Sequence, residues 1–241
     1  MIDQFLAEAP RFYSYYNLLF LGQAALNTLL VSFLGCGIGY GLGFLLAVAR
    51  QRRVVPWAAP RGLAFLWTEI FRRIPFLVLL MCVFFGFQLA GAERSLATVA
   101  TTAVALRMSS LAAENIRAGL ESVQSRQWDA ALTMNFTPLS TLFRIVLPQA
   151  WNVILPPCTI HTVSMIKETA LVSQIGFLEL TFAARMLTQR GFSAFTCYGT
   201  VLVIYFVISW GFASVGRYAE RRLVQDARGR PAAGTARVTA A

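Results

Sequence analysis

The residues best able to do chemistry in this chain are charged side chains inside long apolar runs, namely Glu69, Arg72, Arg73, Arg107, Lys167 and Glu168. A charge near a bilayer centre costs about 2.5–3.5 kcal/mol on insertion scales, so several together need a reason. One reason is structural, because Glu69 lies one helical turn from Arg72 and Arg73 and can pair with either to fix helix register. The other is a polar cavity for a zwitterion, in which Arg or Lys faces its carboxylate and Glu its ammonium group. Both interpretations can hold.

Three prolines interrupt the runs that carry these charges: Pro75, Pro156 and Pro157. Proline lacks a backbone N–H and clashes with the preceding helical turn, so the sequence predicts a break in each span. Backbone groups freed at such breaks can line a substrate cavity at the bilayer midplane. The predicted substrate pathway comprises Glu69, Arg72, Arg73, Lys167 and Glu168.

A second chemically distinctive region is the polar segment 122–148, which separates two apolar runs. Thr137 suits a helix N-cap, and Pro138 suits the first helical position. Apolar residues then follow with helical spacing at Leu139, Leu142, Phe143 and Val146, with Ser140, Thr141 and Arg144 on the other face. Asn135 tolerates the left-handed conformation that ends a helix. The segment therefore predicts two short helices with a bend between them, which is typical of a docking surface rather than a plain loop.

The elements that must position these residues are long apolar helices. The chain has 241 residues, of which 57% are hydrophobic, and its mean hydropathy is +0.60. Apolar runs cover approximately Leu18–Ala49, Leu63–Ala90, Leu96–Ala113, Trp151–Ile175 and Ala194–Gly216. Each approaches or exceeds the roughly 20 residues that cross a bilayer. The sequence therefore predicts an all-α integral membrane protein with about five transmembrane helices and its termini on opposite sides.

The arginines orient this arrangement. On one side they are Arg50, Arg52, Arg53, Arg61, Arg117, Arg126, Arg144, Arg217, Arg221, Arg222, Arg228 and Arg230; on the other they are Arg11, Arg94, Arg185 and Arg190. The positive-inside rule then predicts an extracytoplasmic segment 1–17, a membrane domain 18–217 with a cytoplasmic loop 117–148, and a disordered cytoplasmic tail 218–241. Because the basic residues lie at span ends, the high pI of about 10.2 does not indicate nucleic-acid binding.

Other residue types restrict the chemistry further. Four cysteines lie in apolar runs without C-x-x-C spacing, so Cys36, Cys82, Cys158 and Cys197 are predicted to be small buried hydrophobes. His161, the sole histidine, has no cysteine or second histidine with which to share a metal, and no metal or catalytic site is predicted. The single lysine, Lys167, has no glycine cradle for nucleotide phosphates. No cofactor is expected in this chain, and any ATP would be hydrolysed by a separate subunit.

Glycines mark one face of the first apolar run. Gly35, Gly39 and Gly43 form two successive G-x-x-x-G steps, which allow close approach of another helix. We interpret them as a packing face, within the subunit or against a partner.

Four ordered motifs resemble those of one transporter family. Gln127-x-Asp129-Ala130-Ala131-x3-Asn135, with Ile145-x-Leu147-Pro148, is similar to the cytoplasmic "EAA" loop of ABC-importer permeases. Segments 71–77, 113–123 and 167–171 resemble its polar amino-acid branch, which carries His, Gln, Glu, Arg and opines. This sequence departs from the family pattern in having Asp129 for Glu, Arg126 and Asn135 where glycine is usual, and Arg73-Ile74 for Gly-Thr.

The resemblance implies a MetI-like permease in the bacterial inner membrane. It implies an ABC ATPase dimer, a second permease subunit and a periplasmic solute-binding protein as partners. It also implies that the loop contacts the ATPase through Gln127, Asp129, Ala130, Ala131, Asn135, Leu147 and Pro148. The main alternative is a gradient-driven secondary transporter with Glu69 or Glu168 as its titratable acid, but such a carrier has no use for an ATPase contact. A membrane scaffold would leave the interior charges unexplained. The sequence leaves open the substrate and whether the partner permease is identical.

Overall fold

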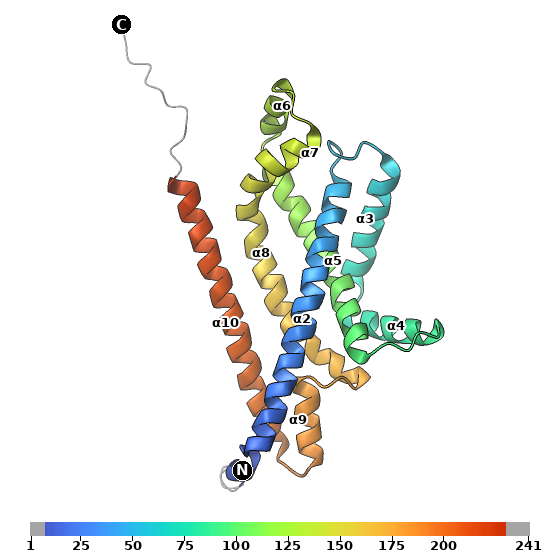
Figure 1. The fold of residues 1–241 in the computed structure, drawn as a ribbon, viewed down its shortest axis with the longest axis vertical. Helices are drawn as coiled ribbons and strands as arrows, with labels where there is room; N and C mark the ends of the chain where they lie inside the picture. Colours follow the sequence, from blue (N-terminus) through green and yellow to red (C-terminus); the bar gives the residue numbers. More distant parts are fainter. Residues whose placement is uncertain (1–7, 230–241) are drawn as a thin grey trace.

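The computed structural model describes residues 8–229, with side chains to residue 222, and this part of the chain is built from helices joined by short turns (Figure 1). After a short helix at residues 8–12, the elements in chain order are α2 Tyr15–Arg50, α3 Ala58–Arg73, α4 Phe76–Leu89, α5 Leu96–Ser122, α6 Ser125–Thr133, α7 Pro138–Thr141, the π-helix η1 Leu142–Val146, α8 Leu147–Glu168, the 3₁₀ helix η2 Thr169–Ile175, α9 Leu180–Gln189 and α10 Ala194–Gly229. The prediction of an all-α protein is confirmed.

Three of these helices, α2, α5 and α10, are long and apolar enough to cross a membrane alone. Two bent pairs can supply further spans, because α3 with α4, and 138–175 with α9, pass the same test together. The five predicted spans therefore correspond to the upper count. The start of α2 and α9 lie at one end of the molecule, whereas α6, α7 and the C-terminal end of α10 lie toward the other (Figure 1).

Close packing of α2 against α5 forms the centre of the bundle. A Cβ added to Gly39 would lie 2.5 Å from the Cβ of Met108, and one added to Gly43 would lie 2.6 Å from the Cβ of Ala112. Nothing lies within 4 Å of the same atom at Gly37. The predicted glycine face is confirmed as a packing surface within the subunit, since only glycine lets these two backbones approach so closely.

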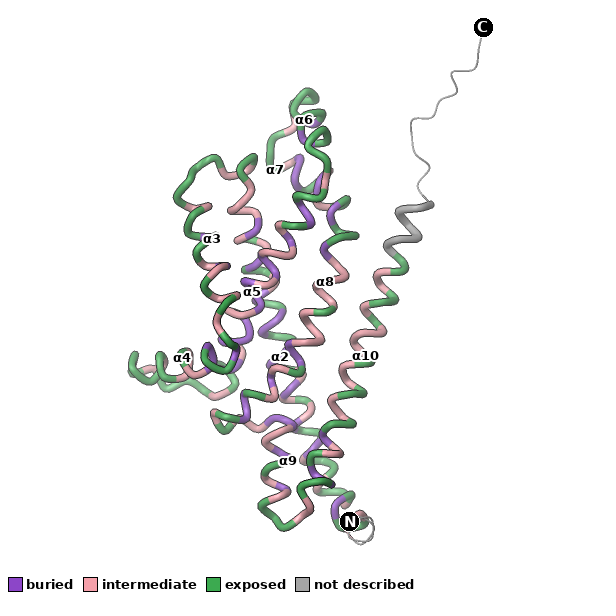
Figure 2. The backbone as a smooth tube through the Cα atoms, turned by 180° about the vertical axis from the view of Figure 1, so that it is seen from behind, coloured by how far each residue is buried: buried purple, intermediate pink, exposed green. Residues whose placement is uncertain are grey.

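Burial is uneven across the helices. Purple, buried segments are most frequent along α5 and recur along α2, whereas α4 and α10 are mostly green and pink (Figure 2). In α10 only 6% of the most apolar window is buried by this chain. One buried cluster at the level of the α3–α4 break includes Phe76, Leu80, Val104 and Met108. Lipid or a partner subunit must therefore cover the apolar surfaces of α4 and α10.

The predicted breaks at prolines are confirmed at one site and wrong at the other. At Pro75 the chain bends by 111° between α3 and α4, as predicted. Pro156 and Pro157 lie inside α8, which continues to Glu168, so the predicted break there is wrong. Side chains from neighbouring helices bind backbone carbonyls around the pair: Asn115 Nδ2 donates to Ile154 O at 2.9 Å, and Tyr40 Oη donates to Cys158 O at 2.6 Å. Such tertiary hydrogen bonds stabilise a membrane helix that contains proline.

Two other predictions need correction. α10 extends to Gly229, so residues 218–229 are helical rather than disordered, in keeping with the good helix propensity of their alanine and arginine. Cys36 and Cys197 are buried as predicted and Cys158 is half-buried, but Cys82 is exposed. Its helix, α4, projects sideways from the bundle (Figure 1). The predictions for residues 1–7 and 230–241 concern parts of the chain outside the described residues.

Candidate functional site

The loop between α5 and α8 folds as a pair of short helices, as predicted. α6 ends at Thr133, and Asn135 adopts the left-handed conformation with φ of 60°. Thr137 then caps α7, because its side chain accepts a hydrogen bond from the Ser140 N–H at 3.3 Å. The bend and the cap are confirmed.

The second helix does not stop before the next span. α7 passes through the π-turn η1 directly into α8, with Pro148 in the first turn of α8. Thr141, Leu142 and Val146 are buried, whereas Leu139 and Phe143 are about half exposed. The predicted apolar face is therefore only partly correct, because a π-turn changes the angular spacing on which the prediction was based.

Trp128 anchors α6 to the membrane bundle. This side chain is only 6% exposed and belongs to a buried cluster with Leu120, Leu142 and Val146. Ala131, one helical turn later, is fully buried. Trp128 was not among the predicted site residues, although it is the only tryptophan in the polar segment and its spacing to Ala131 marks an inward face.

Asp129 lies on the outer side of the same helix and pairs with the α2–α3 loop. Its Oδ1 accepts from Arg53 Nη1 at 3.0 Å, and the Arg53 guanidinium lies 5.7 Å from the centroid of the Trp128 ring. Both charged side chains remain accessible to solvent. Arg53, Trp128 and Asp129 also line a small cavity of about 220 Å³ with Leu132, Pro138 and Thr141.

The other predicted loop residues divide by exposure. Gln127, Ala130, Asn135 and Pro148 are exposed, Leu147 is half-buried and Ala131 is buried. Apolar side chains also remain uncovered on this loop, because Leu132 is 54% and Met134 61% exposed. A helix that combines a fixed position, a carboxylate and uncovered apolar side chains has the chemistry of a protein-contacting surface.

The interior charges begin at the end of α3. Glu69 Oε1 accepts a hydrogen bond from Arg72 Nη2 at 2.5 Å, and Glu69 Oε2 accepts one from Arg73 Nε at 2.8 Å. The Nη2 atom of Arg73 lies 2.6 Å from the same Oε2 atom. The predicted pairing is therefore present, and one carboxylate serves both arginines. Arg73 is the more exposed member, with 74% of its side chain accessible.

Arg107, near the middle of α5, binds the backbone at the α3–α4 break. Its Nη1 donates to the carbonyl oxygens of Arg72 at 2.7 Å, Phe71 at 3.0 Å and Ile74 at 3.4 Å. These carbonyls have no partner within a helix that ends at Arg73, and they carry the negative end of its dipole. A cation from the neighbouring helix therefore satisfies the last turn of α3. The sequence identified Arg107 as an interior charge but could not assign this contact.

Lys167 and Glu168, the other two residues of the predicted pathway, lie at the end of α8 and take no part in the ion pairs of Glu69. Lys167 is exposed and lines a cavity of about 550 Å³ beside α10 with Tyr198, Tyr205 and Ser209. It forms no ion pair with Glu168 or with another carboxylate in the described chain. Glu168 Oε2 is buried and has no hydrogen-bond donor there.

A second ionic network fixes the loop end of the bundle. Glu114 accepts from Arg50 at 2.8 Å and from Arg117 at 2.5 Å, all with half-buried side chains. Because Arg50 ends α2 and Glu114 lies in α5, the network ties the two helices beneath the loop. Sequence spacing indicates the Glu114–Arg117 pair but not Arg50, which is distant in the chain.

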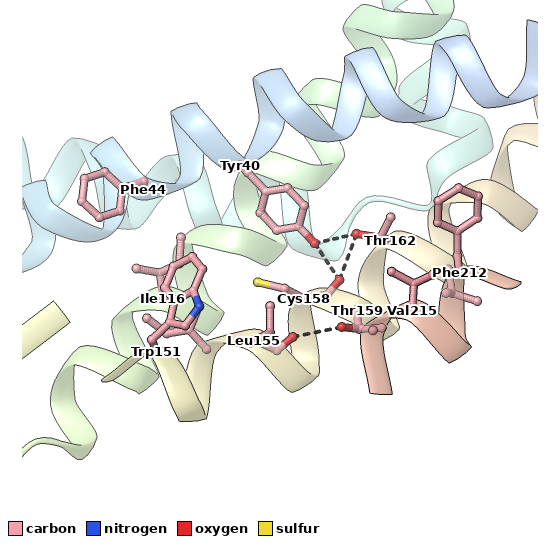
Figure 3. A pocket seen from close by; sticks show the side chains of 13 residues that line it. Tyr40, Phe44, Ile116, Trp151, Leu155, Cys158, Thr159, Thr162, Phe212 and Val215 are labelled. Carbon is pink, nitrogen blue, oxygen red and sulfur yellow. Dashed lines mark hydrogen bonds between the residues drawn. The ribbon is translucent and has the colours of Figure 1, made fainter. Parts of the chain in front are cut away.

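An apolar cavity lies elsewhere, between α2, α5, α8 and α10 (Figure 3). Its volume is about 410 Å³, and Phe44, Trp151 and Phe212 are among its lining side chains. The polar groups there are already satisfied, since Tyr40 Oη donates to Cys158 O and Thr159 Oγ1 donates to Leu155 O (Figure 3). No charged side chain lines it, so it lacks the groups that would recognise a zwitterion.

Fold and site together define a polytopic membrane protein with a docking loop at one end of its bundle. Residues 39–225 match the model of the family described as binding-protein-dependent transport system inner membrane component, and the chain belongs to this family. It is a membrane permease component rather than an enzyme.

Curated relatives agree with this assignment. The chain is 32% identical over 181 residues to a probable amino-acid ABC transporter permease, YckA of Bacillus subtilis (strain 168), covering 75% of this chain and 79% of the relative. It is 33% identical over 186 residues to the L-cystine transport system permease TcyB of the same organism, covering 77% and 78%. These matches favour an ABC permease over a gradient-driven carrier.

Solved structures give the same fold. The structure titled as an amino acid ABC transporter with histidines matches with a TM-score of 0.79 at 28% identity, covering 90% of this chain and 98% of that one. An inward-facing structure of the MetNI methionine ABC transporter matches with a TM-score of 0.75 at 20% identity, covering 87% and 99%. The latter similarity concerns the fold alone.

Proposed function

We propose that this permease imports a polar amino acid or a related compound such as an opine, using ATP that a separate subunit hydrolyses. The observation that carries the proposal is the loop of residues 122–148. It is held against the spans by Trp128 and leaves Asp129, Leu132 and Met134 at its surface. The names of the relatives, which refer to amino acids and to L-cystine, support the substrate class.

The loop contacts the ATPase in this proposal. Gln127, Asp129, Ala130, Ala131, Asn135, Leu147 and Pro148 are the predicted coupling residues. Closure of the ATPase dimer pushes on α6, and the continuous path from α7 through η1 into α8 carries the displacement to the spans. A second permease, identical or paralogous, completes the pathway, and a periplasmic solute-binding protein delivers the substrate.

The interior charges belong to the substrate pathway in the same proposal. Glu69, Arg72, Arg73 and Glu168 lie on or next to the spans that flank the α3–α4 break, and Lys167 lines the cavity beside α10. Because the single carboxylate of Glu69 is shared by Arg72 and Arg73, the trio keeps one net positive charge, which a substrate carboxylate can meet.

The proposed orientation places the loop and the C-terminus in the cytoplasm and the N-terminus in the periplasm. The loop and the C-terminal end of α10 occupy the same end of the molecule (Figure 1), and the arginine-rich α2–α3 connection contacts the loop through Arg53. A C-terminal fluorescent fusion should be fluorescent in the cytoplasm. A cysteine replacing Ser14 should react with an impermeant thiol reagent added from outside; a C-terminal fusion exposed to the periplasm would refute this orientation.

The decisive experiment is uptake by the reconstituted complex. The permease, its ATPase and its binding protein are placed in vesicles and given radiolabelled L-glutamine, L-cystine, L-histidine, L-arginine or L-glutamate. We expect ATP-dependent accumulation of at least one of them. Accumulation driven by a sodium or proton gradient without ATP would support the secondary-transporter alternative, and accumulation of none would reject the amino-acid assignment.

A further inference from the structure

Arg107 has one half of its guanidinium group free. Its three hydrogen bonds to the α3 backbone all come from Nη1. In the part of the chain with described side chains, Nη2 donates to no group, and Nε is buried without a partner. Nε and Nη2 are the two nitrogens on one edge of the planar group, and their N–H bonds point in nearly the same direction. This edge matches the spacing of two carboxylate oxygens.

The charge of Arg107 also lacks a carboxylate of its own. No acidic side chain within residues 8–222 lies within ion-pair distance of it, whereas Arg72 and Arg73 share Glu69 and Arg117 pairs with Glu114. Arg107 thus differs from Arg72, Arg73 and Arg117. Its Nη1 binds backbone carbonyls, and no carboxylate among the described side chains binds its Nε and Nη2.

The backbone contacts give this edge a fixed position. Carbonyls of α3 hold Nη1, and α5 itself is held by its close packing against the glycine face of α2, where Met108 lies against Gly39. A guanidinium fixed on one edge loses little further freedom when its other edge binds an anion. Arg107 lies eleven residues from the start of the 27-residue helix α5, which is close to its middle.

We propose that the free edge of Arg107 recognises the carboxylate group of the transported amino acid, with both carboxylate oxygens bound by Nε–H and Nη2–H. This proposal rests on the proposed function and identifies the cation at the α3–α4 break that meets the substrate. It assigns this role to Arg107 rather than to Arg72, because Nη2 of Arg72 already pairs with the carboxylate of Glu69. A bidentate Arg–carboxylate pair is both stronger and more directional than a single hydrogen bond.

The test compares a carboxylate with its neutral amide. The probe is the amino acid that gives the highest uptake in the panel above, and the competitor is the same amino acid with its α-carboxylate converted to an amide. Binding is measured on the purified permease–ATPase complex in nanodiscs, without the binding protein, so that selection by that protein does not contribute. The variants are Arg107→Gln, Arg107→Lys and the matched control Arg185→Gln, which removes an exposed arginine on α9.

For the wild type and for Arg185→Gln we expect the free acid to bind at least about tenfold more tightly than the amide. Arg107→Gln should bring this ratio close to one, and Arg107→Lys should give an intermediate ratio because an ammonium group cannot bind both oxygens in a fixed plane. If Arg107→Gln weakens the binding of the free acid and of the amide equally, Arg107 serves only to cap the end of α3, and the proposal is wrong. If Arg107→Lys keeps the wild-type ratio of acid to amide affinity, the two-point contact through Nε and Nη2 is wrong.

Two further outcomes are distinguishable. If Arg107→Gln separates the two permeases of the complex, then an acidic side chain of the partner permease occupies the edge, and the proposal is wrong. If the wild-type complex accumulates no amino acid from the panel, the proposed function itself fails. A wild type that transports an amino acid but binds acid and amide equally rejects the Arg107 proposal alone.

Discussion

The loop at one end of the bundle and the charge cluster at the α3–α4 break use their polar groups in opposite ways. In the loop, the charged residues are exposed and the apolar side chains of Leu132 and Met134 are uncovered. At the break, Glu69 serves two arginines, and Arg107 satisfies the end of a helix. The loop therefore presents a whole surface that no other described part of the chain covers, as a protein-docking site does. At the break, by contrast, only single polar atoms of the described side chains lack a hydrogen-bond partner, as in a site for a small molecule.

The largest effect should follow from reversing the charge in the loop. Asp129→Lys places a cation beside Arg53 and on the proposed ATPase contact, so ATP-dependent uptake should fall to background and less ATPase should co-purify. Membrane insertion should be unchanged. Uptake in reconstituted vesicles and the ratio of subunits after purification measure these outcomes.

Exchanging the charges of Arg53 and Asp129 shows whether Asp129 contacts the ATPase or acts only through its ion pair with Arg53. Arg53→Asp combined with Asp129→Arg restores an ion pair within the chain but leaves the wrong charge on α6. If Asp129 acts only through Arg53, the double variant should transport normally. If it contacts the ATPase, the double variant should remain inactive, and normal uptake by the single Asp129→Lys variant would reject any coupling role.

The next effect concerns the anchor of the loop. Trp128→Ala removes a buried indole from the cluster with Leu142 and Val146, so the permease should lose about 3–5 kcal/mol of stability. Leu132→Ala is the matched control, because Leu132 lies on the same helix but is 54% exposed. It should change stability by no more than about 0.5 kcal/mol and yet weaken ATPase co-purification. Equal melting temperatures for both variants would contradict the anchoring role of Trp128.

A smaller effect tests the scaffold of the interior site. Gly39→Ala adds a Cβ that would lie 2.5 Å from Met108, the neighbour of Arg107, so α2 and α5 must separate. Overpacking of this kind costs about 1–3 kcal/mol. Gly37→Ala, which adds the same atom where nothing lies within 4 Å, should be close to neutral. Thermal unfolding in detergent distinguishes them, and similar melting temperatures would show that the glycine face does not limit the packing.

Local chemistry is what the sequence could predict. The cap at Thr137, the turn at Asn135 and the pairing of Glu69 with arginines one turn away all depend on residues close in the chain. The glycine face was equally visible, because its spacing is helical, although its partner α5 was not. The approximate positions of the spans follow from apolar length alone.

Contacts between distant segments account for what the sequence could not predict. α8 continues through Pro156 and Pro157, where donors from α2 and α5 bind the nearby carbonyls of Cys158 and Ile154 and hold the helix against its neighbours. Asp129 meets Arg53, which lies 76 positions earlier, and Arg107 reaches α3 carbonyls 33 to 36 positions away. Among the described side chains, Lys167 and Glu168 form no ion pair with Glu69 or Arg72, so their place in one substrate pathway with these residues stays a prediction.

The smallest effect on stability should come from Lys167→Met. This variant tests whether Lys167 is paired with a carboxylate inside the protein, as Arg72 and Arg73 are. If Lys167 neutralised Glu168, its loss would leave a buried, uncompensated carboxylate and destabilise the complex by several kcal/mol. Lys167 instead lines the cavity beside α10, is exposed and forms no ion pair in the described chain, so the change in stability should stay within about 0.5 kcal/mol. Uptake should nevertheless fall if this cavity is part of the pathway, while the complex continues to hydrolyse ATP. Measuring uptake, ATP hydrolysis and melting temperature on one preparation separates the possibilities. A stable variant with full uptake would remove Lys167 from the pathway and leave the α3–α4 break, with Arg107 at its centre, as the place where this permease meets its substrate.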